Sequence, residues 1–187
     1  MTLYTIVHDF VVRSFAGQDA LIRHLERTEY WARTLRPNAD EALRSAAVAH
    51  DIERSEADSP ANTLLRRRSF RDPQALTYHQ QRGAQIIGDY LTAKGVDSQQ
   101  IERIQDLIRH HEEGGSGDRD FIKDVDSLSF LENNLDYFVT HLLPSHGAAD
   151  VIAKFEWMYR RISNRSVQKL AEPFYRRALT QLQARSD

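Results

Sequence analysis

The chain has 187 residues, and its 25 lysines and arginines are balanced by 27 aspartates and glutamates, which gives a formal net charge of −2. This balance provides no general attraction to nucleic acid or to an anionic membrane, and we expect neither as a partner. The chain contains no cysteine, which excludes disulfides, thiolate metal sites and cysteine nucleophiles.

The first forty residues predict helices. An amphipathic repeat predicts a helix from about Leu3 to Gly17, and this segment lacks the basic start and unbroken apolar run of a secretory signal. No run of about 18 apolar residues occurs elsewhere in the chain, so we expect no membrane span and a cytoplasmic location. A second helix is predicted from Asp19, and a third after Asn38 as its N-cap.

The rest of the chain is also predicted to be helical. Residues 55–72 interrupt the pattern, and the three consecutive arginines at 66–68 are either a solvated face or a lid that contacts phosphate. Pro173 should kink or divide the last helix. The economical interpretation is a single all-α domain over residues 1–187, with roughly seven to nine helices. The five later helices are predicted at about residues 73–93, 98–109, 121–138, 148–162 and 166–184.

The adjacent pair His50 and Asp51 is the strongest functional signal, because it ends a run of small apolar residues. Adjacent side chains on a helix diverge by about 100°, so both can reach one ion only near the helix end or where the helix is locally distorted. We expect His24 on a preceding helix and Asp126 on a later one to complete the set. Imidazole and carboxylate ligands suit a borderline divalent metal, and four ligands leave positions open for water and substrate.

The order of these four residues resembles the HD superfamily of metal-dependent phosphohydrolases, whose motif is a histidine, a histidine–aspartate doublet and a distant aspartate. Ala-Ala-Val-Ala-His-Asp-Ile at 46–52 and Arg-His-His-Glu at 109–112 are similar to the family's contexts, as is Asp-Val-Asp-Ser-Leu at 124–128. The resemblance covers about residues 20–135. It implies an HD-type helical fold, and we expect the C-terminal helices of residues 148–187 to pack on this core.

Two details of the last motif qualify the resemblance. The second aspartate, Asp126, matches the family's ligand, and Asp124 is expected to form hydrogen bonds or cap a turn instead. Ser127 stands where the family's pattern has an arginine. This position therefore does not supply what the arginine contributes in the family.

The resemblance implies a phosphohydrolase that attacks a small phosphate ester, with a nucleotide or related phosphometabolite favoured, through a metal-activated water. Manganese, iron, nickel, cobalt, magnesium and zinc all accept such ligands. One ion and two ions both remain compatible, because the extra histidines bind a second metal in some members. The resulting candidate residues are His24, His50, Asp51 and Asp126 for the metal, Asp51, His79 and His110 for catalysis, Arg54 and His111 for substrate, and His79 with His110 or His111 for a second metal.

Several alternatives stay open at this level. A mixed-valent di-iron oxygenase of the HD type would need the second histidine set, and a non-catalytic module that binds metal or nucleotide would keep the site without turnover. Arg54 can bind a substrate phosphate or form a surface salt bridge. The apolar stretch at 155–159 can complete the core or form a homodimer interface.

Overall fold

The computed structural model describes residues 1–61, 70–115 and 117–185, and within these ranges the chain forms helices and turns without strands. This confirms the predicted all-α class. The described part contains eight helices of nine residues or more, within the expected range. None of the helices in these ranges is long and apolar enough to cross a membrane.

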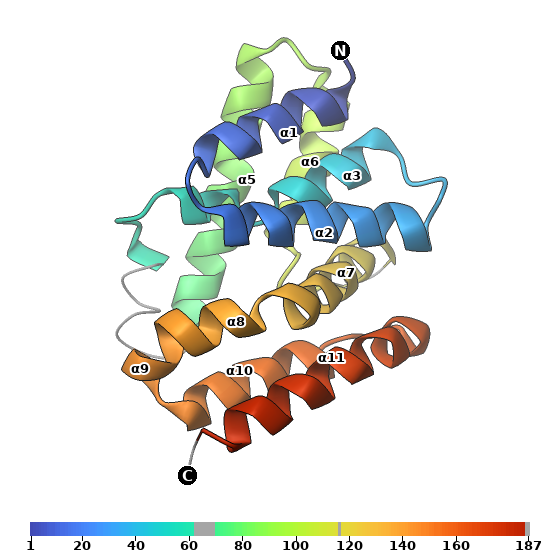
Figure 1. The fold of residues 1–187 in the computed structure, drawn as a ribbon. Helices are drawn as coiled ribbons and strands as arrows, with labels where there is room; N and C mark the ends of the chain where they lie inside the picture. The colour runs from blue at the N-terminus through green and yellow to red at the C-terminus, as the bar shows by residue number, and fades with distance from the viewer. Residues whose placement is uncertain (62–69, 116, 186–187) are drawn as a thin grey trace.

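Figure 1 shows two layers of helices, which enclose two apolar cores. The first core is buried beneath five helices and includes fully buried Phe15, Leu25 and Ile87. The amphipathic repeat explains the first helix, α1, as predicted. A proline at the start explains where α5 begins, and an apolar stripe explains α6. Their bounds are α1 Leu3–Ser14, α2 Asp19–Leu35, α3 Glu41–Ala49, α5 Pro73–Ala93 and α6 Ser98–Arg109.

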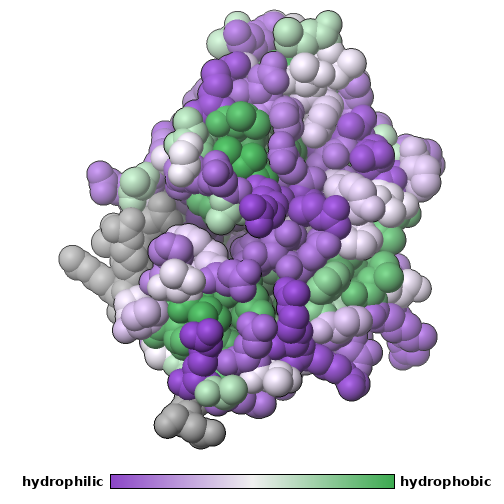
Figure 2. Space-filling model, viewed as in Figure 1, coloured by the Kyte–Doolittle hydropathy of each residue, from purple (hydrophilic) through white to green (hydrophobic). Residues whose placement is uncertain are grey.

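The second core lies among the C-terminal helices and contains Phe155 and Met158, so these two residues complete the core as one of the two interpretations predicted. The bounds are α7 Gly117–Asn133, α8 Leu135–Tyr137, α9 Leu143–His146, α10 Ala148–Arg160 and α11 Arg165–Gln183, with a π-helical turn η2 at Phe138–Leu142. Figure 2 shows a largely hydrophilic face in the same view, interrupted by separate hydrophobic patches over the upper and lower layers.

Helix α7 belongs to both cores and therefore fixes where they meet. Ile122 and Val125 lie in the first core, whereas Leu128 and Leu131 lie in the second. Asp126 is on the segment between these pairs. The polar residues of the candidate site thus lie at the junction of two apolar cores, where burial strengthens electrostatic interactions.

Three local expectations need correction. Asp40, not Asn38, caps α3, because its side chain accepts a hydrogen bond of 2.7 Å from the Leu43 amide. Helix α7 ends at Asn133 instead of continuing to 138. Helix α11 is not divided at Pro173, because the proline and the carbonyl four residues earlier, at Lys169, lie on exposed residues where water can replace the lost bond. The arginines at 66–68 lie outside the described residues.

Candidate metal centre

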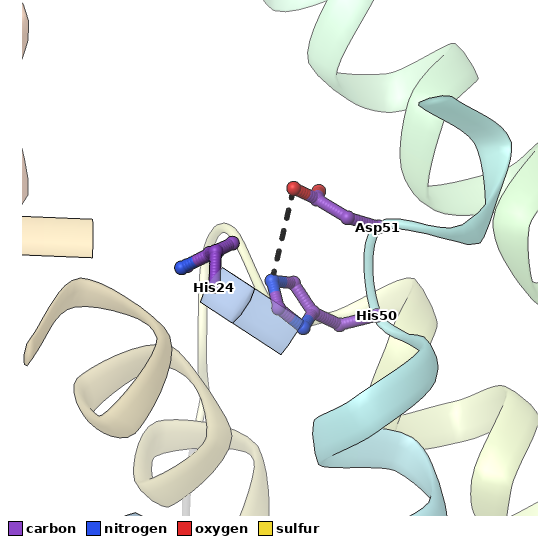
Figure 3. Close-up of side chains that lie close together, drawn as sticks. All are labelled: His24, His50 and Asp51. Carbon is purple, nitrogen blue, oxygen red and sulfur yellow. Dashed lines mark ion pairs between the residues drawn. The ribbon is translucent and has the colours of Figure 1, made fainter. Parts of the chain in front are cut away.

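His50 and Asp51 lie at a break between two helices. Helix α3 ends at Ala49, His50 follows it, and Asp51 precedes the 3-10 turn η1 at Ile52–Ser55. Because the backbone changes direction here, both side chains can point to the same place, as predicted from their adjacency. Figure 3 shows them beside His24 of α2.

The first group of potential ligands comprises His24, His50 and Asp51, with ligand atoms within 4.8 Å of one another. Asp126 of α7 joins this group, because its Oδ1 lies 3.2 Å from Nε2 of His24 and 3.2 Å from Nε2 of His50. The four residues predicted to bind metal are therefore brought together. All four are buried except Asp51, whose side chain is 16 % exposed.

A second group adjoins the first and shares Asp51 with it. Its other members are His79 of α5 and His111 just after α6, again with ligand atoms within 4.8 Å. Oδ1 of Asp51 lies 2.8 Å from Nε2 of His79 and 3.9 Å from Nε2 of His111. Oδ2 lies 3.9 Å from Nε2 of His50. One carboxylate thus faces a histidine set on each side.

Each histidine of the cluster is held by a hydrogen bond at Nδ1, which places the proton there and leaves the Nε2 lone pair for the cluster. A ligating histidine is typically oriented in this way. The Ser129 hydroxyl donates its own proton to the His24 backbone carbonyl. Its oxygen is therefore the acceptor in the hydrogen bond with Nδ1 of His24. The partners are Ser129 Oγ for His24 at 3.0 Å, the Ala47 carbonyl for His50 at 2.9 Å, Glu53 for His79 at 2.8 Å and the Ile108 carbonyl for His111 at 2.7 Å.

The Nε2 atoms of His50, His79 and His111 are buried, and none makes a hydrogen bond of acceptable geometry. Buried nitrogen atoms without a partner are costly, and native proteins seldom keep them without a function. Three such atoms converge on carboxylate oxygens of suitable type for a borderline divalent cation. The donor set therefore fits a metal ion.

Charges within the cluster give its histidines different proton affinities. Burial lowers the pKa of His50, but the carboxylates of Asp126 and Asp51 outweigh it and raise the pKa to about 9. Burial lowers the pKa of His111 to about 4, and the nearby Glu112 carboxylate offsets it only partly. At neutral pH the metal-free cluster thus contains a protonated His50, whose extra proton a metal would displace, and a neutral His111.

Arg161, just after α10, is a site residue that the sequence did not predict. Its guanidinium donates to Asp126 Oδ2 and to Glu112 Oε2, and it donates to Ser127 Oγ at 2.7 Å. The side chain is only 7 % exposed and lies over the ring of Trp157 at 4.5 Å. It neutralises two buried carboxylates at once. No motif signalled it, because it lies outside the segment that resembles the HD superfamily.

A cavity of about 290 Å³ opens beside the cluster. Its polar end includes His24, Asp51 and Asp126 together with Arg54 and Arg161. The remaining wall is mainly apolar and comes largely from the C-terminal layer. The apolar and aromatic lining residues are Leu21, Ala57, Phe70, Phe130, Tyr137, Phe138, Leu142 and Met158.

The structure separates the two adjacent histidines. His111 is fully buried in the second group of potential ligands, as the prediction of a second metal site requires, and its role in substrate binding stays a prediction. His110 is half-buried, and its Nδ1 lies 2.7 Å from the Asp106 carbonyl. It does not line the cavity, and the geometry gives no support to its predicted catalytic role. Arg54 lines the cavity, with Nε 3.8 Å from Asp51 Oδ1.

Asp124 lies on the same helix as Asp126 but has a structural role. Its carboxylate accepts hydrogen bonds of 2.8 Å from the backbone amides of Ser163 and Asn164, in the turn before α11. This agrees with the expected cap. It also fixes the turn that carries Arg161 into the site.

A family profile with the description "Domain of unknown function (DUF4202)" matches residues 18–182. The match includes every residue of both ligand groups and the C-terminal helices that carry Arg161. No curated protein and no solved structure matches the chain. The chain belongs to the DUF4202 family.

The two neighbouring histidines provide a matched test of the second ligand group. We expect His111→Ala to weaken binding of at least one ion by about 10-fold or more, since even loss of an outer partner of a ligand has such an effect. His110→Ala should leave metal content unchanged. Elemental analysis after dialysis against manganese measures both. Equal metal content in the two variants would show that His111 is not a ligand.

Loss of the Arg161 charge should destabilise the metal-free protein. Arg161→Met leaves the Glu112 and Asp126 carboxylates buried without their cation, which costs about 3–5 kcal/mol. Arg160→Met removes an exposed arginine from the adjacent position, where the change should stay within about 0.5 kcal/mol. Urea unfolding in the presence of a chelator measures both. An equally small change in the free energy of unfolding for both variants would contradict this role of Arg161.

Proposed function

We propose that this chain is a metal-dependent phosphohydrolase of the HD superfamily that hydrolyses a small phosphate ester. The observation that carries the proposal is the pair of histidine groups that share Asp51 at the polar end of a cavity. Adjacent ligand groups of this kind suit phosphoryl transfer, because two cations can stabilise both the attacking and the leaving oxygen. The HD-type order of the ligands in the sequence agrees with this assignment.

The ligand groups support a site for two ions. His24, His50 and Asp126 would hold one, His79 and His111 would hold the other, and Asp51 would contact both through its two oxygens. A divalent cation bound there supplies Lewis-acid chemistry that acidifies water and neutralises charge on the phosphoryl oxygens. The four histidines would bind through Nε2 atoms whose direction is fixed by the hydrogen bonds at Nδ1, once a metal displaces the proton of His50.

The cavity limits the size of the substrate. About 290 Å³ is at the lower end of the range for small-molecule sites, so it suits a phosphate monoester such as a nucleotide and not a polymer. Arg54 lines the same end as Asp51, where its guanidinium can form paired hydrogen bonds with phosphate oxygens. We therefore assign Arg54 to substrate binding, as the sequence predicted.

Replacement of the shared carboxylate should abolish hydrolysis while the fold persists. Asp51→Asn removes the charge that both ligand groups share, and we expect metal-stimulated phosphate release to fall by about 100-fold or more, by analogy with loss of one preorganised charge-stabilising group. His110→Ala is the control and should keep wild-type activity. The assay measures phosphate release from nucleotides, sugar phosphates and phosphodiesters. Circular dichroism on the same samples checks that the fold persists. Full activity in Asp51→Asn would defeat the proposal.

The second histidine group also favours one alternative, a mixed-valent di-iron oxygenase, since that chemistry requires ligands for a second iron. Under iron-replete conditions this alternative predicts two irons per chain, one for each group. It also predicts substrate-dependent oxygen consumption and a spin-coupled iron signal in electron paramagnetic resonance. Phosphate release with manganese but no oxygen consumption with iron would exclude the oxygenase.

A further inference from the structure

Lys154 of α10 is a buried cation that faces the cavity. The residue is only 9 % exposed, and it lines the cavity together with Asp126 and Arg161. Among the described residues, its ammonium group takes part in no hydrogen bond or ion pair. Its contacts are with aromatic rings, since Nζ lies 4.4 Å from the centre of the Trp157 ring and 5.4 Å from that of Phe130.

The other buried cations of the described chain have polar partners. Arg161 is paired with two carboxylates, and Lys123 is bound to Asp120 at 2.9 Å and to Ser163 at 2.6 Å. Burial of an ammonium group without such a partner is expensive, and contacts with aromatic rings offset only part of the cost. Lys154 is therefore the exception, and an anion from outside the chain would satisfy it.

The electrostatic surroundings of Lys154 keep it available for such an anion. Burial lowers its pKa to about 8, and the Glu112 carboxylate offsets part of that effect. The group is thus still mainly protonated at neutral pH. The nearest carboxylates are already engaged, because Glu112 and Asp126 are both hydrogen-bonded to Arg161. A ligand anion in the cavity would meet a charged donor without having to displace an existing partner.

We propose that Lys154 binds the phosphate of the substrate and that the organic part of the substrate is a flat, apolar group that lies on the aromatic wall. The position of the lysine carries the assignment, since it lines the cavity together with Asp126 and Arg161 and its ammonium lies near the Phe130 ring of the same wall. A phosphate held there contacts both Lys154 and the polar end of the cavity, while the aromatic wall contacts the organic part of the substrate. This inference rests on the proposed hydrolysis for its reaction, but it predicts anion binding independently of turnover.

The first experiment measures binding of inorganic phosphate to the manganese-loaded protein by calorimetry. Lys154→Met should weaken binding by about 10-fold or more, as expected for loss of a hydrogen bond from a charged group, and Lys154→Arg should lose less. The control Lys123→Met removes a buried ammonium that does not line the cavity, and its Kd should equal that of the wild type. Elemental analysis must show equal manganese in all four proteins.

Lys154→Met should not lower the melting temperature, because it removes a buried charge that has no partner. An unchanged Kd in this variant, at equal metal content, would overturn the assignment, and so would a wild-type protein that binds no phosphate. Should Lys154→Met fail to fold, Lys154→Gln removes the charge with a polar side chain and decides the question. A Kd for inorganic phosphate in Lys154→Gln equal to that of the wild type would then reject the phosphate contact.

The second experiment tests the organic part of the substrate with phenyl phosphate and benzoate. Phenyl phosphate should bind several-fold more tightly than inorganic phosphate, and Phe138→Leu should reduce this advantage without changing the Kd of inorganic phosphate. Equal affinity for phenyl phosphate and phosphate would reject the apolar group, and tighter binding of benzoate than of phenyl phosphate would reject phosphate as the anion.

The two proposals can fail separately. Binding of phosphate through Lys154 without release of phosphate from phenyl phosphate would reject the hydrolase and keep the anion site. Hydrolysis with the same KM in wild type and Lys154→Met would keep the hydrolase and reject the role of Lys154.

Discussion

The structure depends on how one buried carboxylate, Asp126, is shared. One oxygen faces the Nε2 atoms of His24 and His50, and the other accepts a hydrogen bond from Arg161. These partners come from α2, the end of α3 and the end of α10, so Asp126 of α7 links the two layers of helices. A charge can be kept at this depth only if it is paired, and the two layers therefore have one favourable arrangement.

The apolar cores on either side explain why this polar junction is tolerated. Each core buries its own aliphatic and aromatic side chains, and the polar groups are confined to the zone between them. Within that zone most groups have a partner, which is what burial requires. Among the described residues, the buried side-chain atoms without a hydrogen-bond partner are the Nε2 atoms of His50, His79 and His111, together with Glu53 Oε1 and Ser45 Oγ. The ammonium of Lys154 contacts aromatic rings. The three Nε2 atoms surround Asp51, which lines the cavity as Lys154 does, and this makes these groups functional candidates instead of packing defects.

Much of the fold and the first ligand group could be predicted from the sequence, because local signals determine them. Apolar spacing indicated the helices, and the cap expected at Asn38 was only two residues from the observed cap, Asp40. The adjacency of His50 and Asp51 required a helix end, and the chain has one there. The choice between His110 and His111 was not predictable in the same way, since it depends on how the turn after α6 rotates two neighbouring side chains.

Arg161 and Lys154 could not be predicted, because nothing near them in the sequence marks them. Arg161 meets Glu112 and Asp126 across separations of 49 and 35 residues. It also meets Ser127, the position at which the HD pattern has an arginine. A guanidinium is thus present beside this serine after all, but it arrives from another helix. Sequence comparison by position cannot detect such an exchange, whereas contacts in space can.

The two layers of helices contribute different parts of the site, the potential metal ligands and the cavity wall. Chemistry would depend on residues 24–126, where backbone carbonyls, Glu53 and Ser129 fix the direction of each ligand histidine. The cavity wall and Lys154 come mainly from α7 to α10, and of these helices only α7, through Ser129, holds a ligand histidine. If the proposed function holds, changes in the wall can therefore alter which ester fits without moving a ligand histidine. Because Arg161 spans both parts, it is the residue through which a change in the C-terminal layer would reach the metal ligands.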